Sequence, residues 1–411
     1  MSQVRKDKTG HVLRKGESQR KDGRYRFQYY DANHVRHDRY ADTLQRLREI
    51  EKGLEKDLLD GLDTYIAGKV DVNYIVNRYL EMKQNLKGNT LHNYKRMYDI
   101  AVRDTFGKRI IGKVRFTDVK AFYITLMKDR NYSWNTVDNI HSVLHPAFTL
   151  AVRDRVLPMN PTDGVMSELN RDQGKNKGIR HALTVDEQKA FVGFVRASEI
   201  YKKWDNLFTV LLGTGMRIGE CAGIRWQDAD LEANEIRVDH TLEYYKGENE
   251  DCYRLHYHTP KTEAGIRVIP MLGNVRAAIE DEYDHQKNTI GFCQQVIDGH
   301  SGFIFHNRDG KAFNESSVNR ALHRVVDDYN NEEMLNSRRE KRQPLLLPKI
   351  TCHIFRHTFC TRLCEATNNL KQIMYLMGHS DIKTTMEIYA EVTSRKTHET
   401  IEILDQNKYF F

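Results

Sequence analysis

The spacing of hydrophobic side chains changes several times along the 411 residues of this chain. Residues 24–30 alternate basic or polar side chains with aromatic ones, which is the period of a half-buried strand. A turn at residues 31–33 and a returning strand over residues 35–40 follow, and leucines then recur at helical spacing over residues 44–57. Residues 1–65 are therefore predicted to form a small domain in which one helix backs a short sheet.

Apolar side chains recur every three to four residues from about residue 70 to residue 166, which predicts a helical domain over residues 70–166. The pattern contains four amphipathic faces: Val72, Ile75, Val76, Tyr79 and Leu80; Leu91, Tyr94, Met97, Tyr98 and Val102; Val119, Phe122, Tyr123 and Leu126; and Val137, Ile140, Leu144 and Phe148. The longest predicted helix spans residues 136–153. Pro146 is expected to interrupt or kink this helix, because proline has no N–H to donate.

A polar stretch, residues 167–182, separates the helical region from the rest of the chain. It mixes glycine and asparagine with the basic residues Arg171, Lys175, Lys177 and Arg180. Low hydrophobicity and high positive charge predict a flexible, solvated linker.

Residues 183–411 are predicted to form a third domain, mainly helical with a small antiparallel sheet. Within it, residues 236–242 and 253–270 alternate like strands, and residues 259–270 predict a hairpin with its turn near residues 263–265. The fold class is thus multidomain α+β, with a small N-terminal sheet-plus-helix domain, a helical domain and a mainly helical C-terminal domain.

The composition of the chain indicates its cellular compartment. A hydrophobic fraction of 39% and a charged fraction of 29% are typical of soluble proteins. No apolar run approaches the roughly 20 residues that span a bilayer, and no signal-peptide core follows Met1, so we expect a cytoplasmic protein without a membrane partner. Six cysteines in a chain of this length indicate free thiols rather than a disulfide framework.

The net charge of +7 is modest, but its distribution along the chain is uneven. Residues 1–40 hold the bases Arg5, Lys6, Lys8, Arg14, Lys15, Arg20, Lys21, Arg24, Arg26, Arg36 and Arg39 against the acids Asp7, Glu17, Asp22, Asp31 and Asp38. This local excess of positive charge favours a polyanionic partner. A solvated basic tail is the plainer interpretation.

Five residues in the second half of the chain have side chains suited to phosphodiester chemistry. They are Arg217, His353, Arg356, His379 and Tyr389, in that order. A tyrosine phenol, with an unperturbed pKa of about 10, becomes a useful nucleophile when a neighbour takes its proton and fixed cations stabilise the phosphorane. Arginine suits the second task, because its planar fork matches phosphate oxygens and keeps its charge. Such a set can attack a phosphodiester without a metal.

The segments that carry these residues resemble those of tyrosine recombinases, the phage-type integrases. They read Thr-Gly-Met-Arg217-Ile-Gly-Glu, Cys-His353-Ile-Phe-Arg356-His-Thr-Phe and Leu-Met-Gly-His379-Ser-Asp-Ile-Lys-Thr-Thr-Met-Glu-Ile-Tyr389. Each segment alone is a modest signal, whereas all three in this order are a strong one. The front of the chain is similar to the integrases of conjugative transposons, so the resemblance covers nearly all of it.

The resemblance implies an arm-type DNA-binding domain at residues 1–65, a core-binding domain at residues 70–166 and a catalytic domain at residues 183–411. It implies a site-specific recombinase that integrates and excises a mobile element through a 3′-phosphotyrosine link, with no metal or other cofactor. Tyr389 is then the nucleophile. Lys261, in the predicted hairpin, matches the lysine that protonates the departing 5′ oxygen in this family, a role that needs a side chain able to release a proton.

The implied partner is double-stranded DNA, at core attachment sites and at arm-type repeats. The family also implies a homotetramer on DNA and an accessory excision factor. DNA contacts are expected from Arg20, Lys21, Arg24 and Arg26 in the first domain and from Lys175 and Lys177 in the linker. The apolar tail over residues 393–411 is expected to pack either on a neighbouring protomer or on its own domain.

Plainer alternatives stay open. Arg217 and Glu220 could form only a surface ion pair, and Tyr389 could be a core aromatic. Cysteines and histidines gather near the second motif and could hold zinc, although no CxxC pair is present: Cys352, His353, His357, Cys360 and Cys364. A type IB topoisomerase uses similar residues, and a DNA-binding regulator without catalysis is a further class.

Overall fold

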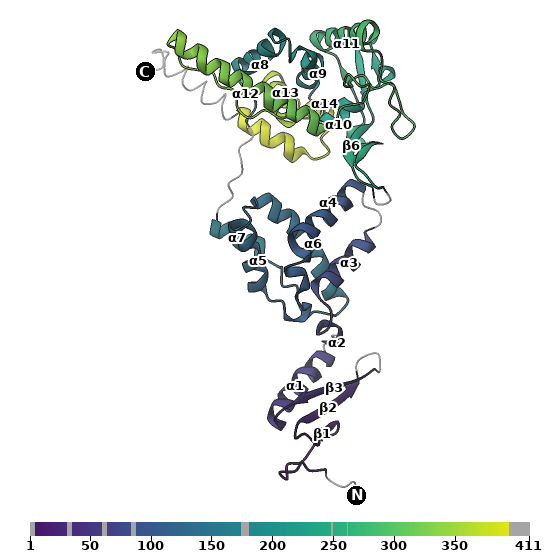
Figure 1. The fold of residues 1–411 in the computed structure, drawn as a ribbon, viewed down its shortest axis with the longest axis vertical. Helices are drawn as coiled ribbons and strands as arrows, with labels where there is room; N and C mark the ends of the chain where they lie inside the picture. Colours follow the sequence, from purple (N-terminus) through teal and green to yellow (C-terminus); the bar gives the residue numbers. More distant parts are fainter. Residues whose placement is uncertain are drawn as a thin grey trace. The chain divides into compact units, whose positions relative to one another are not determined.

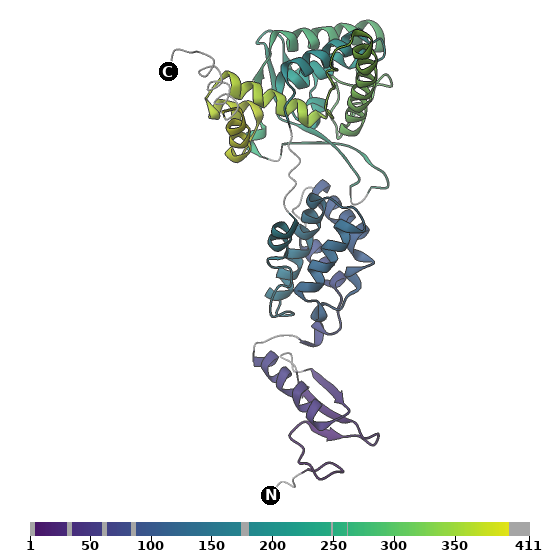
Figure 2. The same cartoon turned by 90° about the vertical axis from the view of Figure 1, so that its left-hand side faces the viewer.

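The computed structural model describes residues 5–30, 35–59, 64–83, 88–173, 181–247, 250–260 and 262–393. The chain divides into two compact units, Met1–Lys177 and Gly178–Phe411. Figures 1 and 2 show the ribbon from two sides. In the described part of the chain, no helix is both long and apolar enough to cross a membrane.

The first unit begins with the expected sheet and helix. Strands β1 (Glu17–Gln19), β2 (Tyr25–Tyr30) and β3 (Arg36–Ala41) form an antiparallel sheet in that order, and α1 (Leu44–Leu59) packs along one face of it (Figures 1 and 2). The prediction of a short sheet backed by one helix is confirmed. Strand β1 was not predicted, because its three residues, Glu-Ser-Gln, carry no hydrophobic alternation.

Alternation along β2 gives this sheet two different faces. Tyr25 and Tyr29 are buried on the side that α1 covers, whereas Tyr30 is exposed. Arg26 is paired in register with Tyr40 on β3, so both point to the open side. The open face therefore carries Arg26 and Tyr40, whereas the covered face carries the buried Tyr25 and Tyr29.

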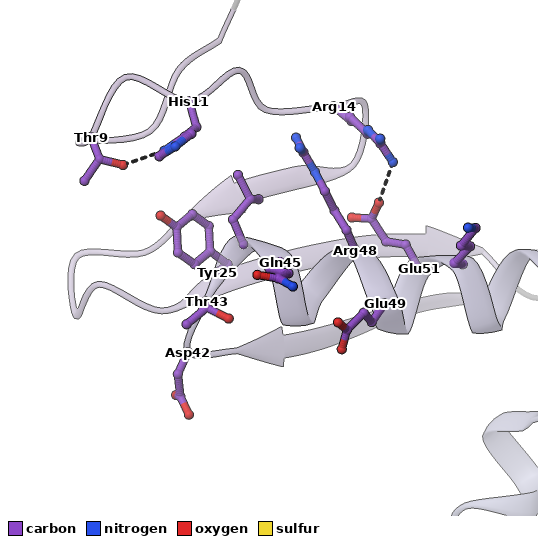
Figure 3. A pocket seen from close by; sticks show the side chains of 12 residues that line it. Thr9, His11, Arg14, Tyr25, Asp42, Thr43, Gln45, Arg48, Glu49 and Glu51 are labelled. Carbon is purple, nitrogen blue, oxygen red and sulfur yellow. Dashed lines mark hydrogen bonds and ion pairs between the residues drawn. The ribbon is translucent and has the colours of Figure 1, made fainter.

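Two carboxylates are buried in this domain, and one of them, Glu51, lines a cavity of ≈ 790 Å³ (Figure 3). Glu17 is fully buried and accepts a hydrogen bond of 3.0 Å from Nε of Arg48, and Glu51 is nearly as buried, with Arg14 3.9 Å away. Although burial opposes its ionisation, Arg48 lowers the pKa of Glu17. Burial and the neighbouring Glu17 raise the pKa of Glu51 to about 7. One acid of this pair is thus readily protonated near neutral pH.

The rest of the first unit is helical, as predicted. Its helices are α2 (Thr64–Ala67), α3 (Val72–Met82), α4 (Gly88–Tyr98), α5 (Phe116–Lys128), α6 (Trp134–Arg153) and α7 (Val165–Gln173), with short turns at Asp99–Arg103, Phe106–Lys108 and Ile111–Lys113. The apolar faces meet in one core that includes Val76, Tyr123 and Leu144. Helix α6 runs through Pro146, so the helix is not interrupted there, and a kink at Pro146 stays a prediction.

The predicted linker also begins too early. Residues 165–173 are helical, and Val165 and Leu169 are fully buried in the core of the helical part. These two apolar residues are four apart and therefore share one helix face, while polar residues occupy the opposite face and gave the stretch its linker-like composition.

The second unit holds a mainly helical fold with small sheets. Its helices are α8 (Val185–Ala197), α9 (Asp205–Thr214), α10 (Ile218–Gly223), α11 (Gly273–His285), α12 (Glu315–Glu340), α13 (Cys352–Ala366) and α14 (Leu370–Met377), followed by a helical segment over residues 382–393. Its strands are β4 (Ala229–Asp230), β5 (Glu235–Val238), β6 (Thr241–Tyr245), β7 (Arg254–His258) and β8 (Arg267–Pro270). The multidomain α+β class is confirmed.

The predicted hairpin over residues 259–270 is wrong. Within the described residues, β7 pairs with β6, and β8 pairs with β5 in the order β4-β5-β8. Strands β7 and β8 bury their apolar side chains in different cores. Ile269 of β8 packs in the main core with Ile236, whereas Tyr257 of β7 packs in a separate cluster with Leu242. Burial in two cores separates strands that are close in sequence.

Candidate active site

Arg217 stands at the junction of two helices. Helix α9 ends at Gly215, whose φ of +62° favours glycine, and Arg217 is the N-cap of α10. The Glu220 carboxylate accepts a 2.9 Å hydrogen bond from the Arg217 backbone N–H and a 2.7 Å bond from Nη1 of the Arg217 side chain. Glu220 therefore caps α10 and orients the arginine at the same time. The Arg217 side chain remains 44% exposed, so its guanidinium can reach a ligand.

Arg356 lies on α13 and is buried, with 7% of its surface exposed. Its Nη1 donates to the carbonyl of Gly215 at 2.8 Å, and its Nη2 donates to the carbonyl of Met377. These carbonyls belong to the C-terminal ends of α9 and α14. The negative ends of two helix dipoles therefore surround the buried guanidinium and compensate part of its desolvation.

His379 follows the end of α14. Gly378 ends that helix with a φ of +62°, and its carbonyl accepts a 3.3 Å hydrogen bond from Nη2 of Arg217. Nδ1 of His379 is 2.8 Å from Oγ1 of Thr385, which is fully buried. The C-terminal end of α14 thus brings Arg217, Arg356 and His379 close together.

The electrostatics of this cluster are strongly positive. Burial lowers the pKa of His379 to about 4, assisted by the charges of Arg356, Arg217 and Arg267, while Glu220 acts in the opposite direction. Burial and the neighbouring Arg217 lower the pKa of Arg356 to about 9. Three guanidiniums face one carboxylate, so these four groups carry a net charge of +2 and His379 is neutral at pH 7.

Glu220 stays ionised despite its burial. Loss of water opposes ionisation, but the charges of Arg267 and Arg217 outweigh that effect and lower the pKa of Glu220. Arg267 on β8 donates from Nη2 to Glu220 Oε2 at 2.9 Å, so the carboxylate joins two arginines. A phosphate diester has the charge and the acceptor geometry that such a cluster can bind.

Tyr389 lies in the helical segment after His379, in the predicted order. Its ring packs partly buried against a small cluster that includes Cys360 and Ile388, and its hydroxyl donates to Oδ1 of Asn368 at 3.4 Å. That distance is long for an O–H···O bond. Among the described residues, no hydrogen bond joins the Tyr389 hydroxyl to Arg217, Arg356 or His379; its hydrogen bond goes to Asn368.

The remaining predicted residues are placed as follows. His353 is exposed at the first turn of α13. Lys261, Lys175 and Lys177 lie outside the described residues. Arg20, Lys21 and Arg24 are exposed in the first domain, and the Arg26 side chain is 38% exposed.

The cysteines near the second motif are parts of the packing. Cys352 belongs to the main core, and Cys360 and Cys364 belong to the cluster beneath Tyr389. In the part of the chain that the structure describes, no group of three or more histidine, cysteine or acidic side chains is arranged to hold a metal ion.

Comparison with known proteins identifies the cluster's family. Residues 181–396, which contain all of Arg217, Arg356, His379 and Tyr389, match the model described as the phage integrase family. The chain belongs to the phage integrase family. Residues 1–58 of this family member match the model described as the DNA binding domain of Tn916 integrase.

Relatives of this integrase-family chain extend over its whole length. The transposase from transposon Tn916 of Enterococcus faecalis is 31% identical over 424 residues, which covers 99% of this chain and 98% of that protein. Among solved structures, a Tn1549 transposon integrase fragment in complex with transposon right end DNA gives a TM-score of 0.69 at 29% identity, covering 82% of this chain and 100% of that chain. The same integrase with a circular intermediate DNA gives 0.68 at 28% identity, covering 81% and 100%. As a member of the phage integrase family, the chain is a tyrosine-type site-specific recombinase.

Two residues at the integrase site were missed by sequence reasoning. Arg267 is a fully buried cation in the strand Arg-Val-Ile-Pro, and the only signal for it was a charged residue in an otherwise apolar strand. Thr385 is one of two adjacent threonines, Thr384 and Thr385, and nothing in the sequence indicates which of them is buried against His379.

Proposed function

We propose that this chain integrates and excises a mobile element of the conjugative-transposon type by site-specific strand exchange. The observation that carries the proposal is the positive cluster of Arg217, Arg356 and Arg267 around a single carboxylate, Glu220, beside the neutral His379. A net charge of +2 held by directed backbone and side-chain bonds is suited to a phosphodiester whose negative charge grows in the transition state. Relatives that are named as a Tn916 transposase and a Tn1549 integrase support the mobile-element assignment.

The proposed reaction exchanges one phosphodiester bond for another. The Tyr389 oxygen attacks the scissile phosphorus and gives up its proton, the bond from phosphorus to the 5′ oxygen breaks, and that oxygen takes a proton to become a 5′ hydroxyl. The 3′ end is then linked to Tyr389. A 5′ hydroxyl from the partner duplex attacks this link, restores the tyrosine and reseals the strand, so the number of phosphodiester bonds is unchanged.

Each residue has a role that its chemistry allows. Arg217 and Arg356 stabilise the phosphorane oxygens, and His379 donates a hydrogen bond to one of them as a neutral imidazole. His353 is proposed as donor or proton acceptor beside the same phosphate. Lys261, which lies outside the described residues, keeps the role implied by its motif, protonation of the leaving 5′ oxygen.

Attack by Tyr389 requires its hydroxyl to exchange the contact with Asn368 for the scissile phosphate. In the structure its hydroxyl bonds weakly to Asn368, and its ring packs beside Cys360. We propose that binding of a core attachment site brings the phenol to the arginine cluster.

The N-terminal domain is proposed to bind a second DNA sequence, an arm-type repeat, through the open face of its sheet. Arg26 lies on that face and is paired in register with Tyr40; its side chain is 38% exposed, and its Nε is 4.0 Å from Oδ1 of Asp38. Arg20 lies 5.3 Å from the Tyr40 ring centroid, on the same side. Arg24 is less available, because its guanidinium is held by Asp22 at 2.9 Å. Lys21 is proposed as a phosphate contact.

Assembly on DNA completes the proposal. A tethered pair of DNA-binding regions can bridge two sites on one duplex and raise the effective concentration of the second contact. The working form is proposed to be a homotetramer on two core sites, with an accessory factor setting the direction of the reaction. The Lys175 and Lys177 side chains, outside the described residues, are proposed to contact the DNA backbone.

The test is covalent capture on a nicked attachment site. Wild-type protein is expected to give a covalent protein–DNA band, and Tyr389→Phe is expected to bind the same DNA without forming that band. An adduct of undiminished yield in Tyr389→Phe would remove Tyr389 as nucleophile. For the N-terminal proposal, footprinting of full-length protein on element-end DNA should show discrete protected repeats that are lost when residues 1–58 are deleted.

A further inference from the structure

Arg267 is a buried cation with three directed hydrogen bonds. Its side chain is 0% exposed. Nε donates to the carbonyl of Leu376 at 2.8 Å, Nη1 donates to the carbonyl of Gly265 at 3.2 Å, and Nη2 donates to Glu220 Oε2 at 2.9 Å. One guanidinium on β8 therefore connects three segments that are distant in sequence.

Two of these segments, those of Glu220 and Leu376, lead to the proposed site. Glu220 orients Arg217 through a 2.7 Å bond. Leu376 precedes Met377 and Gly378, whose carbonyls accept hydrogen bonds from Arg356 and Arg217, and His379 comes next. Arg267 thus helps to fix the position of Arg217 through the Glu220 carboxylate. It helps to fix the positions of Arg356 and His379 through the C-terminal end of α14.

The packing around Arg267 leaves little room for adjustment. A Cβ atom added at Gly378 would lie 2.9 Å from Nη1 of Arg267 and 3.1 Å from the carbonyl oxygen of Ala264. The glycine lets the α14 terminus approach the guanidinium this closely. Because burial of a charge is costly unless it is paired and fully bonded, this arrangement requires the five-donor fork of arginine.

We propose that Arg267 is a positioning residue for strand cleavage, which holds Glu220 and the α14 terminus so that Arg217, Arg356 and His379 converge on one phosphate. It does not touch the DNA itself. The inference rests on the proposed function of the cluster and adds to it a residue that acts through Glu220 and the backbone.

The test is Arg267→Lys in the full-length protein, assayed below its own melting temperature. Lysine keeps the charge beside Glu220 but cannot reproduce three directed bonds. We expect affinity for core-site DNA to stay within about threefold of wild type, and single-turnover cleavage of a nicked substrate to fall about 100-fold, the size of effect expected when a site is misplaced by about 1 Å. The matched control is Arg237→Lys on the neighbouring strand β5, where an exposed arginine pairs with Asp239 at 2.9 Å. This control should cleave like wild type.

A second substrate separates positioning from general damage to the fold. A methylphosphonate at the scissile position removes the negative charge that the arginines stabilise. If Arg267 acts by placing Arg217 and Arg356, the 100-fold deficit of Arg267→Lys should shrink to within about tenfold on this neutral substrate, because less charge stabilisation is at stake. An equal deficit on both substrates would overturn the inference, as would wild-type cleavage by Arg267→Lys.

A double variant covers the case in which Arg267→Lys does not fold. Glu220→Gln with Arg267→Gln removes both buried charges together, and replacing both partners is less costly than leaving one unpaired. The folded double variant is expected to cleave slowly, and cleavage at the wild-type rate would overturn the inference. The Tyr389→Phe experiment stays independent: if that variant still forms adducts, the proposed function fails, whereas loss of adducts together with normal cleavage by Arg267→Lys removes only the role of Arg267.

Discussion

Nδ1 of His379 lies 2.8 Å from the hydroxyl oxygen of Thr385, six residues further along the chain. Thr385 is fully buried, and among the described residues its hydroxyl has no other hydrogen-bond partner. A buried hydroxyl proton needs an acceptor, and the neutral imidazole offers one at Nδ1. Thr385 therefore donates to Nδ1, which leaves the proton of His379 on Nε2, where it can bond to a phosphate oxygen.

Replacement of Thr385 by valine should disturb this arrangement without changing the volume of the side chain. With the donor lost, the imidazole can change tautomer, and we expect single-turnover cleavage to fall roughly 10- to 100-fold, somewhat less than removal of an oxyanion donor itself. Thr385→Ser keeps the hydroxyl and should stay within a few-fold of wild type. Nitrogen NMR of the His379 ring should show the proton on Nε2 in wild type; a proton on Nδ1 would contradict the assignment.

The His379 pKa predicts a specific pH dependence. In the free protein, burial and three arginines hold this pKa at about 4, below the usual 6.5. Between these values the unfolded chain binds more protons than the folded one, so the His379 contribution to stability rises with pH from about 4 to 6.5 and is constant above. NMR titration of His379 should give a value near 4, and core-site DNA should raise it because phosphate charge offsets the arginines. A value near 6.5 in the free protein would contradict the burial of this ring.

Glu51 gives the N-terminal domain the opposite pH dependence. Its pKa of about 7 lies above the usual 4.5, so the folded domain binds more protons than the unfolded chain between these values. Stability from this group is present at pH 4.5 and is lost as the pH rises through 7. Glu51→Gln, which mimics the protonated acid, should raise the unfolding temperature of this domain at pH 8 and flatten its pH dependence between 5 and 8. Glu49→Gln, at an exposed site on the same helix, is the control and should change neither.

The two faces of the N-terminal sheet predict a ranking of arginines. Arg26→Ala should weaken binding to arm-type DNA about tenfold and lower the salt dependence of binding, because this side chain lies on the open face beside Tyr40. Arg24→Ala should have a smaller effect, since Asp22 holds the Arg24 guanidinium at 2.9 Å, whereas the aspartate beside Arg26, Asp38, is 4.0 Å away. Fluorescence anisotropy at several salt concentrations measures both. Equal effects of the two variants would indicate that the domain binds DNA through a diffuse basic surface and not through the open face of the sheet.

The sequence predicted features that depend on local spacing. The period-two pattern of residues 24–30 gave β2, and the apolar spacing near Leu144 gave α6. Each of these depends on interactions between residues that are near one another in the chain, and so they can be deduced from periodicity and capping rules.

Features that depend on distant partners could not be deduced. Strand β8 pairs with β5 and not with β7, because Ile269 is buried with Ile236 in a core that the alternation alone cannot identify. The burial of Arg267 could not be predicted for the same reason, because its partner Glu220 is 47 residues away in the sequence. Nor could the place of the Tyr389 hydroxyl beside Asn368 be predicted, since the motif gives the order of the residues and not the conformation of the free protein.

The anchors of the arginine cluster are mostly main-chain atoms. Arg356 bonds to the carbonyls of Gly215 and Met377, and Arg217 bonds to the carbonyl of Gly378. A carbonyl is present whatever side chain a codon specifies, so the anchor at Met377 does not depend on a functional group of that side chain. Insertion or deletion of a single residue near the end of α14, by contrast, would displace the carbonyls of both Met377 and Gly378. Most side-chain changes there would not displace these two carbonyls; Gly378 is the exception, because a Cβ atom there would lie 2.9 Å from Nη1 of Arg267.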